Sequence, residues 1–269
     1  MSTVEPRRAA VSLSNGVEMP LLGLGVWQIA DGRQTENAVT WALEAGYRHV
    51  DTAQLYGNEP AVGRAIRASG LPRTEVFVTT KLQPRARRPA RAVDESLGRL
   101  GMDHVDLFLI HWPTRAAVEQ WAALEHAYDQ GLARAIGVSN WGAHDLDDVV
   151  ARGRIPPHVD QVQFSPFQFR RALLAHCHEL QITLEGYSPL TRGRSLEDPT
   201  VMRVAQEHGR TPAQVVLRWA IERDVAVIPK STHRERIVEN AEIFDFQLAP
   251  DAIATLDALD RTGGTAEAR

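Results

Sequence analysis

Apolar runs of strand length alternate with amphipathic helical segments along nearly all of this 269-residue chain. The alternation repeats eight times, and every connection is too long for a β-hairpin. Parallel strands need crossovers of this length, and strict alternation of strand and helix indicates a parallel sheet covered by helices. The predicted strands are residues 21–26, 48–51, 76–81, 105–111, 133–139, 159–163, 182–187 and 225–229.

Eight such units in a chain of this length predict an α/β fold, a closed (β/α)8 TIM barrel. An N-terminal β-hairpin is predicted ahead of the barrel, from runs 11–13 and 17–19 around the turn Ser14-Asn15-Gly16. Extra helices are predicted late in the chain. The predicted helices are residues 34–45, 59–68, 89–101, 117–130, 143–150, 170–180, 198–208, 212–222, 234–240 and 250–259.

The barrel is expected to form a single domain over residues 1–269, with residues 1–10 and 262–269 flexible. An open doubly wound sheet is the structural alternative. Its usual phosphate loop, G-x-G-x-x-G after the first strand, is incomplete here, because Gln28 occupies the third glycine position after Gly23 and Gly25.

Composition excludes several classes of protein. The formal net charge of −4 argues against sequence-independent nucleic-acid binding, which needs a basic surface. No apolar run reaches the length of a transmembrane helix, and the N-terminus lacks the apolar core of a signal peptide. A single cysteine, Cys177, allows neither a disulfide framework nor a cysteine-rich metal site. We therefore expect a cytoplasmic protein with no membrane, nucleic-acid or metal partner.

Polar side chains are predicted at the C-terminal ends of neighbouring strands, where barrels of this kind carry their active sites. Asp51 ends the second strand, Lys81 the third and His111 the fourth, and Tyr56 follows in the loop after Asp51. Of the 30 basic residues, 28 are arginine and only Lys81 and Lys230 are lysine. Lysine is a compact charge whose pKa shifts on burial, so these two positions are functional candidates.

The four side chains form a coherent set for protonating a carbonyl oxygen. A free tyrosine, with a pKa of about 10, is a weak acid at neutral pH, and a neighbouring ammonium lowers that pKa. We therefore expect Lys81 to acidify Tyr56, and Asp51 to hold Lys81 in its charged form. His111 would orient the carbonyl oxygen by hydrogen bonding. None of these groups can supply a hydride, so a cofactor is required.

The end of the eighth strand offers a site for that cofactor. Barrels commonly bind phosphate after strands seven and eight, near a helix N-terminus. Lys230, Ser231 and Thr232 follow the strand directly, and Arg236 lies in the next predicted helix. Their cations and hydroxyl groups suit a phosphate monoester.

Six ordered motifs resemble those of the aldo-keto reductase family from about residue 11 to residue 260. They are Asp51-Thr52-Ala53-Gln54-Leu55-Tyr56-Gly57-Asn58-Glu59, Val78-Thr79-Thr80-Lys81-Leu82, His111-Trp112-Pro113, Gly137-Val138-Ser139-Asn140, Gly186-Tyr187-Ser188-Pro189-Leu190, and Ile228-Pro229-Lys230-Ser231 with Arg236, Glu239 and Asn240. Within the family, the chain most resembles bacterial 2,5-diketo-D-gluconate reductase-like members and other short prostaglandin- or xylose-type members.

The resemblance implies NADPH-dependent reduction of aldehydes, dicarbonyls or keto-sugars to alcohols, with NADPH/NADP+ as cofactor and a small carbonyl compound as substrate. It implies a catalytic tetrad with Tyr56 as general acid, completed by Asp51, Lys81 and His111. The implied cofactor residues are Ser139, Asn140 and Gln161 at the nicotinamide carboxamide, Tyr187 on the nicotinamide ring, Ser188 and Leu190 at the pyrophosphate, Lys230, Ser231, Thr232 and Arg236 at the adenosine 2′-phosphate, and Glu239 and Asn240 at the adenine. Trp27 and Trp112, with Tyr56, are the implied walls of the substrate pocket.

Some positions depart from the family pattern. Asp160 replaces the usual asparagine before Gln161, and a carboxylate there would favour the positively charged oxidised cofactor. Gln163 and Ser165 replace the usual glutamate and histidine. The loop at 114–118 is short and the chain stops at Arg269 where many members carry a longer loop, so an open site with broad specificity is expected.

Three other functions remain as alternatives. The first is a nucleotide-binding regulatory module with little turnover. The second is a barrel hydrolase that pairs the carboxyl groups of Glu185 and Asp51. The third, a short-chain dehydrogenase, is disfavoured because no lysine follows Tyr56 at four residues.

Overall fold

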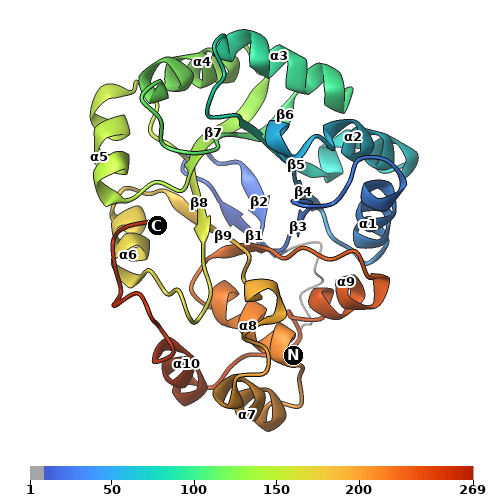
Figure 1. The fold of residues 1–269 in the computed structure, drawn as a ribbon, viewed down its shortest axis with the longest axis vertical. Coiled ribbons are helices and arrows are strands. Elements are labelled where there is room, and N and C mark those ends of the chain that lie inside the picture. The colour runs from blue at the N-terminus through green and yellow to red at the C-terminus, as the bar shows by residue number, and fades with distance from the viewer. Residues whose placement is uncertain (1–8, 269) are drawn as a thin grey trace.

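A computed structural model describes residues 9–268. In it the eight predicted strands form one sheet, and their order across the sheet is their order along the chain. The strands are β3 (Leu24–Gly25), β4 (His49–Asp51), β5 (Phe77–Leu82), β6 (Val105–Ile110), β7 (Ala133–Ser139), β8 (Val159–Gln163), β9 (Thr183–Tyr187) and β10 (Ala226–Ile228). Each strand pairs in parallel with the next. Figure 1 shows helices surrounding the sheet on all sides.

The first and last strands meet, which closes the sheet into a barrel. Leu22 forms a parallel bridge with Val227, and the N–H of Gly23 donates to the carbonyl of Val227 at 2.8 Å. Gly25 makes this approach possible, because a Cβ there would lie 2.8 Å from the carbonyl oxygen of Ile228. The predicted TIM barrel is confirmed, and the open doubly wound sheet is excluded.

Ten α-helices are described, close to their predicted ranges. They are α1 (Arg33–Glu44), α2 (Glu59–Ala68), α3 (Pro89–Leu100), α4 (Ala117–Asp129), α5 (Ala143–Arg152), α6 (Arg171–Glu179), α7 (Pro199–Glu207), α8 (Pro212–Ile221), α9 (Arg234–Ala241) and α10 (Pro250–Asp257). Several helices begin with proline, whose fixed φ and missing N–H suit the first helical position. Thr211 caps α8 through a capping box with Gln214. The extra helices α7 and α10 lie together at the lower edge of Figure 1.

The N-terminal hairpin, β1 (Ala10–Ser12) and β2 (Glu18–Pro20), lies across the barrel in the view of Figure 1. Leu13 and Met19 are buried in one apolar cluster with Phe77, Leu107 and Ala226, which lie in the N-terminal halves of their strands. The hairpin therefore fills the N-terminal end of the barrel with apolar side chains. The opposite end remains for polar groups.

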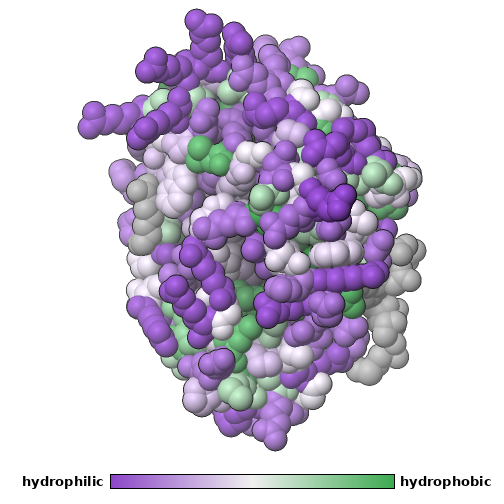
Figure 2. Space-filling model, turned by 45° about the vertical axis from the view of Figure 1, so that its right-hand side comes forward, coloured by the Kyte–Doolittle hydropathy of each residue, from purple (hydrophilic) through white to green (hydrophobic). Residues whose placement is uncertain are grey.

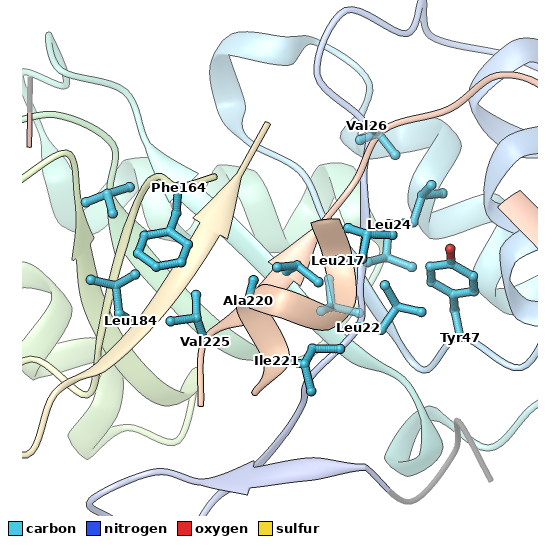
Figure 3. Packing of buried hydrophobic residues seen from close by; sticks show 14 of the residues in the cluster. Leu22, Leu24, Val26, Tyr47, Phe164, Leu184, Leu217, Ala220, Ile221 and Val225 are labelled. Atoms are coloured by element: carbon cyan, nitrogen blue, oxygen red, sulfur yellow. The ribbon is translucent and has the colours of Figure 1, made fainter. Parts of the chain in front are cut away.

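Alternation along the strands sorts side chains between the barrel interior and an outer core. In β6, Leu107 and Leu109 belong to the interior cluster, whereas Phe108 and Ile110 pack against the helices. Figure 3 shows part of the outer core. The same period of two decides which polar residues can reach the interior.

The C-terminal stretch, expected to be flexible at 262–269, makes defined contacts over its described part. The N–H of Ala143, which begins α5, donates to the carbonyl of Ala266 at 3.0 Å, and the N–H of Ala172 in α6 donates to Gly264 at 3.1 Å. These bonds satisfy first-turn N–H groups that have no partner inside their own helix. Residues 1–8 and 269 lie outside the described residues.

The molecular face drawn in Figure 2 is mostly hydrophilic, with apolar side chains in small groups. Within the described part of the chain, no helix has the length and apolar character needed to span a membrane.

Candidate active site

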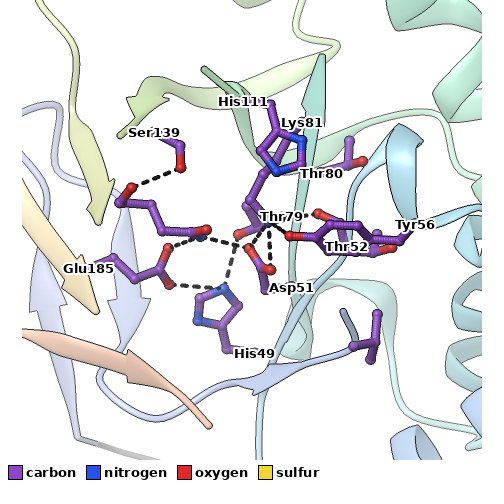
Figure 4. Close-up of polar contacts among 12 residues, drawn as sticks. His49, Asp51, Thr52, Tyr56, Thr79, Thr80, Lys81, His111, Ser139 and Glu185 are labelled. Carbon is purple, nitrogen blue, oxygen red and sulfur yellow. Dashed lines mark hydrogen bonds and ion pairs between the residues drawn. The ribbon is translucent and has the colours of Figure 1, made fainter. Parts of the chain in front are cut away.

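Four predicted side chains meet at the C-terminal mouth of the barrel (Figure 4). Asp51 ends β4, Lys81 lies in β5, His111 follows β6, and Tyr56 ends the 3-10 helix η2 (Gln54–Tyr56). The Nζ of Lys81 donates to both carboxylate oxygens of Asp51, at 2.6 and 2.7 Å. It also contacts the carbonyl of Thr52 at 2.9 Å and the hydroxyl of Tyr56 at 3.4 Å. The structure thus brings the predicted set together.

The loop that carries Tyr56 is held by two side-chain amides. Asn58 is buried, and its Nδ2 donates to the carbonyl of Val26 at 2.9 Å. Gln54 donates to the hydroxyl of Ser96 in α3 at 2.9 Å. Neighbouring elements therefore fix the loop on two sides, and the Tyr56 phenol is presented to the mouth from a rigid support.

Lys81 is fully buried, yet the pKa of its amine is raised, which favours the protonated, charged form. Burial lowers the pKa of Lys81, but the negative charge of Asp51, with smaller contributions from Tyr56 and Glu185, outweighs burial and raises that pKa above its usual value. Burial raises the pKa of Asp51, and Lys81 and Gln161 oppose this by charge and hydrogen bonding. The short bidentate contact is that of a charged ammonium held by a carboxylate.

The Tyr56 phenol keeps its proton more tightly than predicted. Burial raises the pKa of Tyr56 to about 12, although the Lys81 ammonium lowers it. The expected acidification by Lys81 is therefore present but smaller than the effect of burial. Removing the phenolic proton would nonetheless leave an anion 3.4 Å from an ammonium, which stabilises the anion.

His111 is neutral at physiological pH. Burial, together with the charge of Lys81, lowers the pKa of His111 to about 3. Its ring lies edge-on to that of Tyr56, with 5.5 Å between ring centroids. The Nδ1 of His111 is buried without a hydrogen-bond partner in residues 9–268. The Nε2 is thus the ring nitrogen available to a bound molecule.

A second layer of polar side chains lies beneath the first. The Nε2 of Gln161 in β8 donates to Asp51 at 2.8 Å and to Glu185 of β9 at 2.6 Å. The Nε2 of His49 lies 2.9 Å from the Thr79 hydroxyl and 3.6 Å from Glu185. Gln161 thus separates the two carboxyl groups that a hydrolase would use, which removes support for that alternative.

Ser139, Asn140 and Tyr187 form a connected group beside the tetrad. The hydroxyl of Tyr187 donates to the Oδ1 of Asn140 at 2.7 Å. The Nδ2 of Asn140 donates to the hydroxyl of Ser139 at 3.0 Å and to the carbonyl of His111 at 3.1 Å. Asn140 has a left-handed backbone, with φ of 65°, which asparagine tolerates better than most residues. Amide and hydroxyl groups are therefore concentrated next to the candidate acid.

A cavity of about 1100 Å³ opens from the tetrad across the mouth of the barrel. Its predicted lining residues are Trp27, Asp51, Tyr56, His111, Trp112, Ser139, Asn140, Gln161, Tyr187, Ser188 and Lys230. Trp27 is 42% exposed, and the guanidinium of Arg192 lies 4.8 Å from the centroid of its ring. The cavity therefore has an aromatic wall at the mouth and polar groups at its base.

The other predicted cofactor residues lie outside the lining of this cavity. They are Leu190, Ser231, Thr232, Arg236, Glu239 and Asn240. Arg234 forms an exposed ion pair with Glu44 at 3.0 Å, whereas Arg236 has no ion pair within the described residues. Glu239 accepts a hydrogen bond from the hydroxyl of Thr211 at 2.5 Å, so its carboxylate is already engaged with the start of α8.

The sequence reasoning missed several residues of the cavity wall. These are Gly25, Leu55, Phe167, Gln168, Thr191, Arg192, Arg194, Ser195, Glu197, Asp198, Ile228, Arg261 and Thr262. Most lie in loops after β8 and β9 or in the C-terminal segment, where no periodicity places a side chain. The position of Arg261 depends on a hydrogen bond from its N–H to the carbonyl of Phe167 at 3.2 Å. No pattern in the sequence predicts this bond.

Asp160 does not face the cavity. The expectation that its carboxylate favours the positively charged oxidised cofactor is therefore not supported. Its neighbours Gln161 and Gln163 line the cavity, and alternation along β8 directs Asp160 outward. Burial there raises the pKa of its carboxyl well above the usual value, and Asp145 of α5 adds to the rise. The alternation itself could have revealed this orientation from sequence.

Comparison with known proteins identifies the family to which the chain belongs. The sequence model of the Aldo/keto reductase family matches residues 21–261. The chain is 44% identical to morphine 6-dehydrogenase of Pseudomonas putida, over 93% of this chain and 90% of that protein. It is 41% identical to glyoxal reductase of Bacillus subtilis, over 93% and 92%.

A solved structure of an aldo-keto reductase also matches the fold of this chain. The Bombyx mori aldo-keto reductase, determined in complex with NADP, superposes with a TM-score of 0.88 at 34% identity, covering 96% of this chain and 94% of that one. The chain therefore belongs to the aldo-keto reductase family of oxidoreductases.

Proposed function

We propose that this protein reduces small aldehydes, dicarbonyls or keto-sugars to alcohols with NADPH, and that Tyr56 is the general acid. The observation that carries the proposal is the contact of Lys81 with both Asp51 and the Tyr56 hydroxyl, at the base of a cavity. The nearby neutral His111 completes the set. A sequence identity of 41% to a glyoxal reductase supports a small dicarbonyl as one substrate.

The residues of the cavity fit a nicotinamide cofactor. At about 1100 Å³ the cavity is larger than a small carbonyl compound needs. It extends from Gln161, Ser139 and Asn140 at the tetrad to Lys230 near the start of α9. These residues would hold the carboxamide at one end and phosphate at the other, with Tyr187 beside the nicotinamide ring. When bound, the cofactor supplies the hydride that no side chain here can provide.

The Tyr56 phenol would hydrogen-bond to the carbonyl oxygen of the substrate and transfer its proton as negative charge develops there. Lys81 would stabilise the resulting phenolate, and Asp51 keeps Lys81 in place and charged. The Nε2 of His111, neutral over the physiological range, would donate a second hydrogen bond to the same oxygen. Asp51, Lys81 and His111 are buried and Tyr56 is partly buried, and reduced contact with water strengthens these interactions.

We assign the preference for NADPH over NADH to the residues that follow β10. Lys230 is exposed, Ser231 and Thr232 offer hydroxyl groups, and Arg236 lies in the first turn of α9 without an ion pair in the described chain. A 2′-phosphate would gain charge-assisted hydrogen bonds from this group. Ser188 and Leu190 would lie along the pyrophosphate, and Glu239 and Asn240 near the adenine.

Trp27 and Trp112 would form the walls around the substrate. Both line the cavity, and the loop between β6 and α4 is short. Such walls suit small carbonyl compounds of varied shape. We further propose that the protein acts as a monomer, and that it is a 2,5-diketo-D-gluconate reductase-like member that accepts keto-sugar substrates.

The proposal is tested by measuring NADPH oxidation with methylglyoxal, a panel of aldehydes and diketones, and a keto-sugar. Turnover with several of these substrates is expected, with NADPH preferred over NADH. Tight NADPH binding without turnover of any carbonyl would instead favour a nucleotide-binding regulatory module. Protein that binds no nicotinamide cofactor would contradict both functions.

A further inference from the structure

Glu185 is a buried carboxyl group that takes no part in the proposed proton transfer. It lies in β9, its side chain is fully buried, and it points into the barrel beneath the tetrad (Figure 4). The cavity lining does not include it. Burying a carboxyl group costs free energy unless it makes favourable polar contacts. Its contacts therefore indicate what it does.

The one hydrogen bond of the Glu185 carboxyl within the described chain is to Gln161. Its Oε2 accepts from the Nε2 of Gln161 at 2.6 Å, whereas its Oε1 has no hydrogen-bond partner and lies 3.6 Å from His49. Asp51, by contrast, is already occupied by the Lys81 ammonium at both oxygens. Gln161 is thus the sole hydrogen-bond partner of Glu185 in the described residues, whereas Asp51 bonds both Lys81 and Gln161.

The two carboxyl groups together fix the orientation of the Gln161 amide. Its Nε2 donates to Asp51 at 2.8 Å and to Glu185 at 2.6 Å, so both N–H bonds are used. A flipped amide would direct its Oε1 at the Asp51 carboxylate, which can only accept, and would lose that bond. The Oε1 of Gln161 must therefore point away from Asp51 and Glu185. Gln161 itself lines the cavity.

We propose that Glu185 is a positioning residue for the nicotinamide carboxamide: it locks Gln161 so that the amide oxygen is presented to the carboxamide N–H. The inference rests on the proposed use of a nicotinamide cofactor. A carboxamide has both a donor and an acceptor group, and a ring held by both has one orientation rather than two. Glu185 therefore acts on ring placement through Gln161, without touching the cofactor.

The test compares three ligands by fluorescence titration. NADP+ has the carboxamide N–H, its 3-acetylpyridine analogue has a methyl group there instead, and 2′,5′-ADP lacks the nicotinamide. Glu185→Ala should weaken NADP+ binding by about tenfold, the worth of one well-made hydrogen bond. Binding of the acetylpyridine analogue and of 2′,5′-ADP should stay within about twofold of wild type.

Two further variants separate positioning from general damage. Glu185→Gln keeps an acceptor for the Gln161 amide and should restore most of the NADP+ affinity. In a Gln161→Ala background, Glu185→Ala should cause no additional loss, because residues that act through one another show coupled effects. Unchanged 2′,5′-ADP binding by each variant also reports that the fold is retained.

Several results would overturn the role of Glu185. They are equal weakening of all three ligands by Glu185→Ala, an unchanged affinity for NADP+, or a loss that persists in full in the Gln161→Ala background. A wild-type protein that binds neither NADP+ nor 2′,5′-ADP would instead overturn the proposed function, before any variant is compared.

Discussion

Replacing Asp51 with asparagine should destabilise the protein strongly, because it leaves the Lys81 ammonium buried without its counter-charge. Lys81 is fully buried and contacts both carboxylate oxygens at 2.6 and 2.7 Å. Its other two contacts, with the Thr52 carbonyl and the Tyr56 hydroxyl, carry no full charge. Removing one partner of a buried pair costs about 3–5 kcal/mol. In a chain of this length that loss lowers Tm by roughly 5–9 °C.

The stability lost in Asp51→Asn should become smaller as pH rises. In the wild type the pKa of Lys81 is raised, so the stability that it contributes is present below about pH 10.4 and is lost as pH rises through the folded pKa. In Asp51→Asn, burial is no longer opposed by Asp51 and lowers the pKa of Lys81. The variant therefore gains stability as pH rises toward 10.4, and the gap between the two proteins narrows.

Urea unfolding at pH 7 and pH 9.5 measures both effects. Glu36→Gln is the matched control, because Glu36 forms an exposed ion pair with Arg64 at 2.7 Å. That variant should differ from the wild type by less than about 1 kcal/mol at either pH. If Asp51→Asn cost under about 1 kcal/mol at pH 7, or if its deficit grew with pH, the account of the buried pair would be wrong.

Three further predictions concern single residues. The ring signals of His111 should not titrate by NMR between pH 5 and pH 8, because burial and Lys81 lower its pKa to about 3; a midpoint near 6.5 would contradict this. Asp160→Asn should raise stability at pH 7, because burial raises the pKa of that carboxyl above its unfolded value, and the gain should shrink toward pH 4, where the unfolded chain also keeps the proton. Urea unfolding at both pH values checks this, and a loss at pH 7 would refute it. Arg236→Ala should weaken 2′,5′-ADP binding by about tenfold or more and leave 5′-AMP binding unchanged; equal weakening would place Arg236 away from the 2′-phosphate.

The barrel and three of the four tetrad residues could be predicted from periodicity, whereas Tyr56 lies in the loop after β4 and is predicted from its place in a motif. Strand-length runs alternate with helical ones, and a residue that ends a strand must lie at one end of the barrel. Asp51, Lys81 and His111 satisfy that rule, so their convergence needed no three-dimensional information. The same period of two places Glu185 and His49 inside and Asp160 outside, although their roles depend on distances that sequence does not contain.

Loop residues and net pKa values could not be predicted in the same way. Arg192 reaches Trp27 across the cavity mouth from the loop after β9, and its own φ of 57° is unusual for a non-glycine residue. No pattern in the sequence signals that conformation. The pKa of Tyr56 depends on a balance between burial and the charge of Lys81, and only the folded environment shows that burial is the larger effect.

The most direct test of the central claim is the turnover of Tyr56→Phe with NADPH and methylglyoxal, with NADPH affinity measured on the same protein. The substitution removes one hydroxyl group and leaves the ring that lies against His111. The account predicts that kcat falls by at least about a hundredfold, the lower range for loss of a general acid, while the Kd for NADPH stays within about threefold. A variant that keeps most of its turnover would show that Tyr56 does not donate the proton.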